Sequence, residues 1–391
     1  MKPLHIRTVK TIQDRHAFLS LPWRVYKDDP YWVPPLFSER MEFVDPEHQK
    51  FFEHAEVEFF LARRGESSSS SGQGEVVGSI AAFTNHRHNQ FQDENVGFFG
   101  FFEVLDDPEA ARVLLETAEN WVRERGHDSI RGPAQFSTNE ECGLLVDGFD
   151  DRPRILMTYN PRRYMDYIKQ AGYEKAMDLW AWAINLDILE GGEKFPDKLA
   201  RVVEKVKQRG HIHIRKIKMK EFDIEVERVK KLYNTSWAKN WGFVPMTDAE
   251  IGKISEELRP IIDTDLVFIA EVDSKPAGFS LTLLDMNEPL RLAYPKPDTP
   301  EWWTLSKFAW HWKVRRRISW VRVFALGVLP EYRALGIDAL FYYHTALEAM
   351  KKGIQFAEMS WILENNDMMN RAIELMGAKI YKTYRFYEKA L

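Results

Sequence analysis

The sequence predicts an α+β protein made of two copies of one structural unit. The first observation is a pair of apolar, strand-like runs joined by a polar turn, which occurs twice at an interval of about 200 residues. The second is the order that follows each pair: a strand, a helix, a short strand and a second helix. The third is the composition, 45% hydrophobic with a net charge of −5 over 391 residues, which is typical of a folded chain with a large core.

The first copy begins with a predicted hairpin. Residues 57–62 and 76–83 are apolar and rich in β-formers, and the Ser/Gly run of residues 66–74 between them predicts a flexible surface loop. The rest of the unit is predicted as a strand, a helix, a short strand and a helix, over residues 95–105, 108–125, 129–132 and 160–172.

The second copy repeats this order. Its hairpin is predicted over residues 266–271 and 277–282, with the turn Asp273-Ser274-Lys275-Pro276 between them. The strand, helix, strand and helix that follow are predicted over residues 321–329, 336–352, 357–363 and 366–377. Gly191, Gly192 and Pro196 interrupt both periodicities, so we place the boundary there and predict domains of residues 1–192 and 193–391.

Composition excludes several classes of protein. The single cysteine, Cys142, excludes a disulfide scaffold, and the chain has no apolar run near 18 residues that could span a bilayer. Its start has no apolar segment typical of a signal peptide. A net negative charge argues against a general nucleic-acid binder. We therefore expect a cytoplasmic protein without a membrane partner.

The segment that carries chemistry is residues 323–340. A β-branched strand leads into a loop with Pro330, and then into a helix with Gly336 in its first turn. Helix N-termini present unpaired N–H groups and a partial positive charge, so this turn can hold a phosphate. Gly336 has no Cβ and would let such a ligand approach the backbone.

This segment resembles the acyl-CoA-binding motif of the GCN5-related N-acetyltransferase (GNAT) superfamily, in which a Gln/Arg-x-x-Gly-x-Gly/Ala loop cradles the pyrophosphate of CoA. Arg333 and Gly336 match the first and fourth positions. Asn366 and the helix that ends at Gly377 resemble the second motif of the family, which contacts pantetheine. The specific match covers residues 321–387, and a looser match extends upstream to about residue 211.

The resemblance implies tandem GNAT-like units, each a mixed, mostly antiparallel sheet flanked by helices. It implies acetyl-CoA or a longer acyl-CoA as co-substrate of the second unit, without a metal. The residues that it assigns to the donor site are Leu326, Gly327, Val328, Arg333, Ala334, Leu335, Gly336, Ile337, Asp338, Ala339 and Asn366. The first copy has Asp106, Asp107 and Glu109 in place of the loop, and we expect it not to bind CoA.

Two positions depart from the family pattern. Asp338 stands where the family has Gly or Ala, and its carboxylate would repel a pyrophosphate. Ile373 stands where the family often has a tyrosine that protonates the CoA thiolate. Tyr384, with Tyr381 and Tyr387 as alternatives on the final strand, is our candidate acid. Glu364, at the end of the preceding strand, is our candidate base, and a solvated or capping role is its alternative.

The leading hypothesis is an N-acyltransferase that moves an acetyl or longer acyl group from CoA to the amine of a small molecule. One alternative is a non-catalytic binding protein with the same fold. Another is a transferase that uses acyl-carrier protein or aminoacyl-tRNA, for which the basic run at residues 313–317 is the discriminating feature. The acceptor, the acyl chain length and the oligomeric state, monomer or homodimer, are not readable from the sequence.

Other features have structural interpretations. Most of seven tryptophans are expected in core or inter-domain packing, and the alternative for some is to line an apolar channel for a long acyl chain or lipid-like amine. They are Trp180, Trp182, Trp302, Trp303, Trp310, Trp312 and Trp320. His86 and His88 lack the further ligands of a metal site and are expected in a solvated loop.

Overall fold

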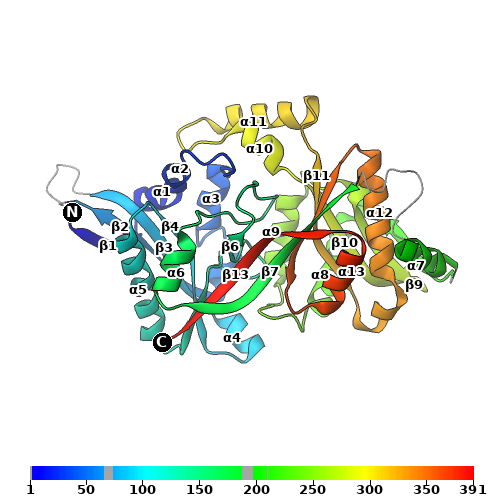
Figure 1. Ribbon diagram of the computed structural model, residues 1–391, viewed down its shortest axis with the longest axis horizontal. Coiled ribbons are helices and arrows are strands. Elements are labelled where there is room, and N and C mark those ends of the chain that lie inside the picture. Colours follow the sequence, from blue (N-terminus) through cyan, green and yellow to red (C-terminus); the bar gives the residue numbers. More distant parts are fainter. Residues whose placement is uncertain (1, 66–73, 187–196, 209) are drawn as a thin grey trace. The chain divides into compact units, whose positions relative to one another are not determined.

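The computed structural model of the chain describes residues 2–65, 74–186, 197–208 and 210–391 (Figure 1). The chain forms two compact units. Unit 1 contains Met1–Asp178, Pro289–Val314 and Tyr384–Leu391, and unit 2 contains Leu179–Glu288 and Arg315–Thr383. Most of the loop predicted at residues 66–74, and the boundary predicted near residue 192, lie outside the described residues.

The sheet of unit 1 contains the strands predicted over residues 57–62, 76–83, 95–105 and 129–132, together with β1 and the end of β13. Its neighbours in space are β1, β2, β3, β4, β5 and the end of β13, and every pair is antiparallel except β4 with β5. The strand bounds are Leu4–Thr8, Ala55–Arg64, Glu75–Asn85, Val96–Val104, Ser129–Gly132 and Lys379–Ala390, and β6 (Leu144–Asp147) pairs with β13. Parallel strands need a crossover, which α5 (Pro108–Glu124) supplies.

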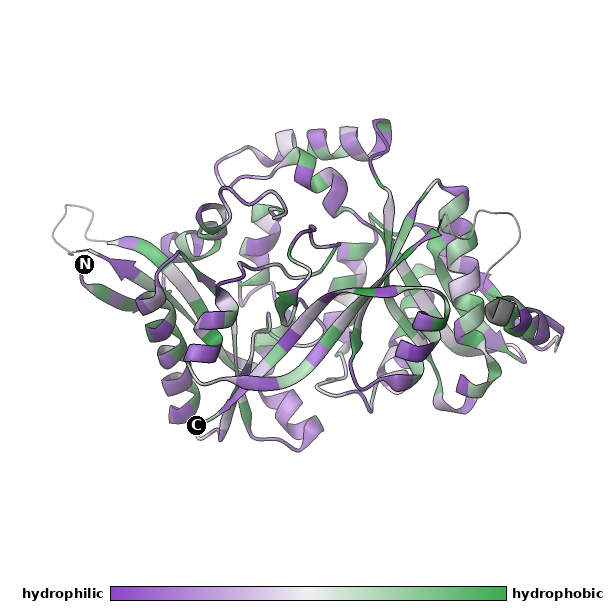
Figure 2. Ribbon diagram, in the orientation of Figure 1, coloured by the Kyte–Doolittle hydropathy of each residue, from purple (hydrophilic) through white to green (hydrophobic). Residues whose placement is uncertain are grey.

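Helix α5 packs on this sheet through one face. Leu114, Ala118 and Val122 recur at helical spacing and join the core of the sheet. Asp107 begins the helix, because its side chain accepts a hydrogen bond from the N–H of Ala110 at 3.0 Å. Figure 2 shows hydrophilic residues along the outer side of α5.

Further helices complete unit 1. The α-helices are α1 (Ile12–Ser20), α2 (Pro22–Val25), α3 (Phe37–Phe43), α4 (His86–Gln92), α6 (Tyr164–Gln170), α10 (Asn287–Ala293), which begins in unit 2, and α11 (Glu301–Ala309). A 3₁₀ turn, η1 (Lys50–Glu53), and a π-helical turn, η5 (Trp310–Val314), are also present.

Unit 2 repeats the architecture of unit 1, which confirms the predicted duplication. Its strands in spatial order are β8, β9, β10, β11, β12 and the end of β7, and only the pair β11–β12 is parallel. Their bounds are Ile212–Lys216, Val267–Val272, Lys275–Leu284, Trp320–Val328, Phe356–Leu363 and Glu174–Asn185. The crossover helix is α12 (Ile337–Lys351), the counterpart of α5.

Helices cover both faces of this second sheet. Phe268 and Ala270 of β9 pack with Phe341 of α12, whereas Ile269 between them packs with Leu232 of α8, because successive side chains of a strand point to opposite faces. The remaining helical elements are α7 (Asp197–Gln208), η3 (Met219–Glu221), α8 (Phe222–Ser236), α9 (Asp248–Leu258), η4 (Thr264–Leu266), η6 (Pro330–Leu335) and α13 (Asp367–Leu375).

The strand that completes each sheet crosses the unit boundary. β7 begins in unit 1, and its residues from Leu179 onward belong to unit 2. β13 begins in unit 2, and its residues from Tyr384 onward belong to unit 1. The compact units are therefore not two uninterrupted halves of the chain.

Two local predictions in unit 1 are wrong. Trp302, Trp303 and Trp310 are 68%, 50% and 54% exposed rather than packed inside, because they lie on the side of α11 and η5 opposite the buried Thr304.

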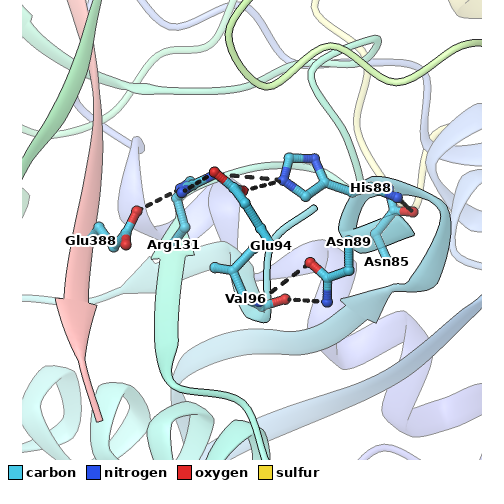
Figure 3. A network of polar contacts seen from close by, with 7 residues as sticks. All are labelled: Asn85, His88, Asn89, Glu94, Val96, Arg131 and Glu388. Carbon is cyan, nitrogen blue, oxygen red and sulfur yellow. Dashed lines mark hydrogen bonds and ion pairs between the residues drawn. The ribbon is translucent and has the colours of Figure 1, made fainter. Parts of the chain in front are cut away.

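The other wrong prediction concerns two histidines. The segment with His86 and His88 is helix α4 rather than a solvated loop, because the Asn85 side chain accepts a hydrogen bond from the N–H of His88 and starts a helix. His88 is buried, and its Nε2 lies 2.9 Å from a carboxylate oxygen of Glu94, which also pairs with Arg131 (Figure 3). The hydrogen bonds from His88 and Arg131 lower the pKa of Glu94 to about 2.

Candidate active site

The parallel strands at the centre of unit 2 diverge part of the way along their length. β11 pairs with β12 from Trp320 to Val323, opposite residues 356–359, and no pairing between these strands is formed beyond that point. β11 also carries a bulge, because Val323 and Ala325 pair with consecutive residues of β10 and leave Phe324 without a partner in that ladder. Bulges are typical of sites where a strand turns its side chains towards a functional region.

This bulge precedes Leu326, Gly327 and Val328, which the resemblance assigns to the donor site. All three residues still pair with β10, and the irregularity is at Phe324. The carbonyl of Leu326 accepts a hydrogen bond from the indole N–H of Trp237 at 3.1 Å, and the carbonyl of Val328 accepts one from Arg333 at 3.3 Å. This end of β11 is therefore tied to α8 and to the following loop.

The loop before α12 makes a tight turn into the helix. Residues 330–335 form a 3₁₀ turn, and Gly336 has a φ of +80°, which glycine adopts without strain. The first intrahelical bond runs from the N–H of Leu340 to the carbonyl of Gly336, so Ile337, Asp338 and Ala339 form the first turn, whose N–H groups have no partner within the helix.

Gly336 has a second role, in packing. A Cβ at this position would lie 3.0 Å from Cγ2 of Val206 and 3.2 Å from Cγ1 of Val202, both on α7. The valines of α7 therefore occupy the space on the side of Gly336 where a Cβ would stand, and a ligand cannot approach the glycine from that side. The turn before Gly336 also packs, because Tyr332 and Leu335 contact the core beneath α12, while Ala334 is exposed.

Arg333 contacts the protein's own backbone. Its Nη2 donates to the carbonyl of Ser236 at 2.7 Å, and its Nε donates to the carbonyl of Val328. The guanidinium thus joins the end of α8, the end of β11 and the loop. In this conformation its hydrogen bonds position the loop.

Asp338 occupies the first turn of α12 and is mostly buried. Burial raises the pKa of its carboxyl group, although the N–H groups of Asp338 and Ala339 act in the opposite direction. Tyr342, one turn later, has a pKa raised by burial and by the charge of Asp338. The acid is therefore close to the helix N–H groups that a phosphate would use.

The second motif is built around two asparagines. Asn366 begins α13, with its side chain accepting a hydrogen bond from the N–H of Met369 at 3.3 Å. Asn370 is buried, and its amide donates to the carbonyls of Leu363 and Glu364 at 3.0 and 3.3 Å. Its oxygen accepts from the indole of Trp182 at 3.1 Å. The resemblance assigns Asn366 alone to the donor site, and Asn370 of the same motif fixes the end of β12.

The predicted acid and base belong to different units. Glu364 is half-buried, directly after the end of β12 in unit 2. Tyr384 is fully buried and belongs to unit 1. Ile373, which replaces the tyrosine of the family, is fully buried in the core between α12 and α13. The roles assigned to Glu364 and Tyr384 remain predictions.

A buried charged cluster that the sequence reasoning missed lies where β11 and β12 diverge. Arg322 is 2% exposed and Glu358 is 0% exposed. These two residues are register partners in the last rungs of the parallel ladder, with 3.7 Å between Nε of Arg322 and Oε1 of Glu358. Burying both charges is costly unless they are paired and hydrogen-bonded, which indicates a specific role for the cluster.

Two hydroxyl groups complete this cluster. Ser360 accepts a hydrogen bond from Nε of Arg322 at 2.9 Å and donates to Oε1 of Glu358. Tyr381 of β13 donates its hydroxyl proton to Oε2 of Glu358. Tyr381 is half-buried, whereas Arg322, Glu358 and Ser360 are buried, so its hydroxyl connects a buried carboxylate with a more accessible part of unit 2.

An aromatic stack adjoins Tyr381. The ring of Trp320 lies 6.0 Å from that of Tyr381 and 4.7 Å from that of Phe356, and both pairs are stacked. All three side chains are half-buried.

The sequence contained a signal for the charged cluster. Arg322 stands between Val321 and Val323, inside a buried strand. Glu358 stands in the same way between Ala357 and Met359.

In unit 1 the corresponding divergence of strands is filled by the chain itself. β4 and β5 pair only over residues 96–98 and 129–131. Beyond that point the N–H of Ala134 donates to the carbonyl of Phe99 at 3.0 Å, and the carbonyl oxygen of Ala134 would lie 1.7 Å from a Cβ on Gly100. This arrangement supports the prediction that the first copy binds no CoA.

Unit 1 also holds an acid with a shifted pKa. Burial raises the pKa of Glu103, on β4, to about 7. The hydroxyls of Tyr26 and Tyr164 donate to its two oxygens at 2.9 Å each, and the side chains of both tyrosines are at most 2% exposed. The two tyrosines therefore enclose the carboxyl group of Glu103.

The described residues contain neither a metal-binding cluster nor a membrane-spanning helix. Among the described residues, no group of three or more His, Cys, Asp or Glu side chains is placed to hold a metal ion. The same part of the chain contains no helix with the length and apolarity needed to cross a bilayer.

Comparison with known proteins yields two full-length relatives, although no family model matches the chain. Protein YghO of Escherichia coli (strain K12) is 32% identical over 391 residues, which cover 99% of this chain and 95% of that protein. The bacterial ceramide synthase of Caulobacter vibrioides is 36% identical over 393 residues, which cover 99% of this chain and 98% of that protein.

Solved structures agree on the fold. A tandem GNAT protein from the clavulanic acid biosynthesis pathway has a TM-score of 0.55 at 11% identity, and the match covers 99% of this chain and 98% of that chain. The GNAT-type glucosamine N-acetyltransferase region of a fungal β-N-acetylglucosaminidase has the same TM-score at 15% identity, with 100% of this chain and 38% of that chain covered. The tandem GNAT fold is thereby confirmed, and the chain belongs to the family that contains Protein YghO and the bacterial ceramide synthase.

Proposed function

We propose that the protein is an N-acyltransferase that moves a long acyl group from acyl-CoA to the amine of a sphingoid-type lipid. The relationship along the whole chain to a bacterial ceramide synthase supports the substrate class, because a ceramide is the amide of a fatty acid and a sphingoid base. The tandem GNAT fold supports acyl transfer.

The observation that carries the reaction type is the buried Arg322–Glu358 cluster at the divergence of β11 and β12. In acyl transfer the amine nitrogen attacks the thioester carbonyl, the carbon–sulfur bond breaks, and the thiolate leaves. The amine must first lose a proton, which a positioned carboxylate can take directly or through a hydroxyl. Glu358 and Tyr381 form such a pair, with Arg322 opposite the carboxylate.

The proton path follows from the hydrogen bonds of the cluster. Tyr381 takes a proton from the ammonium group of the acceptor as it passes its own proton to Glu358. The reverse transfer then delivers that proton to the departing thiolate, so the cluster ends in its original state. The attacking nitrogen releases its second proton to solvent as the amide forms. This relay replaces the acid that the family would have at the position of Ile373, which is buried in the core. Proton transfer of this kind contributes roughly 10²- to 10⁴-fold to rate.

The donor's phosphates are assigned to the first turn of α12. The N–H groups of Ile337, Asp338 and Ala339 there suit an anion, and the partial charge of the helix favours one. The Asp338 carboxyl group competes for the same N–H groups. Its raised pKa eases its protonation when a phosphate arrives, which reconciles this acid with donor binding.

The acceptor chain is assigned to the aromatic stack beside Tyr381. Trp320, Phe356 and Tyr381 form a half-buried apolar surface, and the hydroxyl that would accept the amine proton belongs to one of its rings. An apolar chain gains roughly 25 cal/mol for each Å² that it buries on such a surface. A long-chain amine would therefore bind with its amino group near Glu358.

Mass spectrometry of the products tests this proposal. The purified protein is incubated with palmitoyl-CoA and a sphingoid base, and in parallel with palmitoyl-acyl-carrier protein or a short-chain amine. The proposal expects a long-chain amide that forms from acyl-CoA. Product only from the carrier protein would support the alternative of a transferase that uses acyl-carrier protein as its donor. Donor binding without product would favour a non-catalytic protein of this fold.

A further inference from the structure

The face of α11 and η5 that is open to solvent is unusually apolar. It carries Trp302, Trp303, Leu305, Trp310 and Val314, which are 68%, 50%, 42%, 54% and 59% exposed, and we call these residues the tryptophan face. Six of the thirteen large hydrophobic residues that are exposed in the described chain lie between Leu292 and Val314. Large aromatic side chains are buried in most folded proteins, so their gathering on one exposed face indicates a binding surface.

Helix α11 does not bury its largest apolar side chains. Its inner side carries Thr304, which is 2% exposed, with the half-buried Lys307 and Phe308, and η5 continues this side with the half-buried His311 and Trp312. Lys307 donates a hydrogen bond to the carbonyl of Ala293. Polar groups and Phe308 therefore hold the helix on unit 1, while Trp302, Trp303 and Trp310 remain outside. Packing within the protein does not explain this arrangement.

Positive charge accompanies the tryptophan face. Lys313 lies on η5, and Arg315, Arg316 and Arg317 follow directly in the chain; we call these four residues the basic run. All four are exposed, and none forms an ion pair among the described residues. From Trp302 to Pro330 the sequence contains no Asp or Glu at all. The segment is strongly cationic in a chain whose net charge is −5.

We propose that the tryptophan face and the basic run dock the protein on the surface of an anionic phospholipid bilayer. Tryptophans settle at the level of the lipid headgroups, since their rings are apolar and their N–H groups are polar. Exposed Lys and Arg add electrostatic attraction to anionic lipids. A helix that lies in the interface needs no spanning length, so the absence of a membrane-spanning helix among the described residues is consistent with this binding.

A bilayer explains these residues better than a nucleic acid does. Leu305 and Val314 stand beside the tryptophans, and aliphatic side chains gain from insertion among acyl chains but have no stacking surface for bases. The basic run is also short, whereas binding along a nucleic-acid strand needs an extended positive groove. This proposal does not depend on the acyl-transfer reaction.

Co-sedimentation of the full-length protein with vesicles tests it. Vesicles of phosphatidylcholine alone are compared with vesicles that also contain phosphatidylglycerol, without acyl-CoA or amine. The triple variants Trp302→Ser/Trp303→Ser/Trp310→Ser and Arg315→Gln/Arg316→Gln/Arg317→Gln are compared with the wild-type protein. We expect binding to the anionic vesicles, weakened by about tenfold or more in each variant and by added salt.

A control variant separates this surface from general hydrophobicity. Ile12→Ser/Ile224→Ser removes two side chains that are 56% and 54% exposed on other helices, and it should bind as the wild type does. Quenching of tryptophan fluorescence by brominated lipid should occur in the wild type and be lost in the tryptophan variant. Failure of the wild type to bind anionic vesicles, equal binding by all variants, or preferential binding to single-stranded RNA through the same residues would overturn the proposal.

Discussion

At the scale of single residues, Tyr381 tests the proposed chemistry most cleanly. Its hydroxyl is bonded to Glu358 while its ring stacks on Trp320, so Tyr381→Phe removes the proton path and keeps the stack. We predict that kcat falls by about 100-fold or more, with KM for both substrates nearly unchanged. Steady-state kinetics measure this effect. Tyr343→Phe, at a half-buried tyrosine on α12 outside the cluster, is the matched control. An unchanged kcat in Tyr381→Phe would remove Tyr381 from the mechanism.

Asp338 makes a second prediction, about donor affinity and pH. A bound phosphate raises the pKa of this carboxyl group further, so donor binding takes up a proton and strengthens as the pH falls through that pKa. Asp338→Asn should tighten acyl-CoA binding about fivefold at neutral pH, the equivalent of roughly 1 kcal/mol of charge repulsion. It should also reduce the pH dependence. Calorimetric titration across pH measures both effects, and identical affinities and slopes in the two proteins would contradict this role.

The sequence predicted some residues of the site and missed others for a physical reason. Arg333 and Gly336 stand in a local motif whose spacing can be read along the chain. Arg322, Glu358 and Tyr381 lie on three strands, and their contacts depend on register between distant segments. A charge inside a buried strand indicates a partner but does not say which one.

At the scale of elements, the first copy shows how the same strand divergence is closed. Gly100 allows the carbonyl of Ala134 to approach β4, and the Cβ of an alanine there would lie 1.7 Å from that oxygen. We predict that Gly100→Ala lowers the free energy of unfolding by about 1 to 3 kcal/mol or more, because backbone must move. Urea unfolding measures this loss. Gly252→Ala, on α9 with nothing within 4 Å, should instead stabilise the protein by roughly 0.5 to 1 kcal/mol. Equal effects of the two substitutions would refute the explanation.

Elements with strong periodicity were predictable, and short polar segments were not. α5 and α12 match the predicted helices, and in both the buried residues recur at helical spacing on a sheet. α4 was missed because its first turn depends on the Asn85 cap, and its histidine is buried only through Glu94 and Arg131. That ion pair joins segments that are far apart in the sequence.

At the scale of the whole molecule, the C-terminal residues of the chain belong to unit 1. Glu388 pairs with Arg131, Lys389 with Glu119 and Arg385 with Asp178. Deletion of residues 384–391 should therefore open unit 1, although these residues directly follow a segment of unit 2 in the sequence. We predict faster tryptic cleavage at Arg131, which is 6% exposed in β5, with Arg322 of unit 2 still protected. Peptide mapping over time measures this change, and cleavage first at Arg322 would contradict the assignment of these residues to unit 1.

The duplication was readable from the sequence, but the composition of the units was not. Strand order and spacing repeat along the chain, and the repeat survives large divergence in side chains. The assignment of Pro289–Val314 and Tyr384–Leu391 to unit 1 depends on long-range packing, such as the hydrogen bond from Trp23 to the carbonyl of Pro295 at 2.8 Å. No local pattern encodes such a contact.

Hydrogen exchange with and without a non-reactive thioether analogue of palmitoyl-CoA tests the proposed donor site. If the donor binds where β11 and β12 diverge, exchange should slow in residues 324–328 and in the first turn of α12. The corresponding residues of unit 1, 99–104, should be unchanged because Ala134 closes that divergence. Slower exchange in residues 99–104 with none in β11 would place the donor in the other unit and contradict the proposed site.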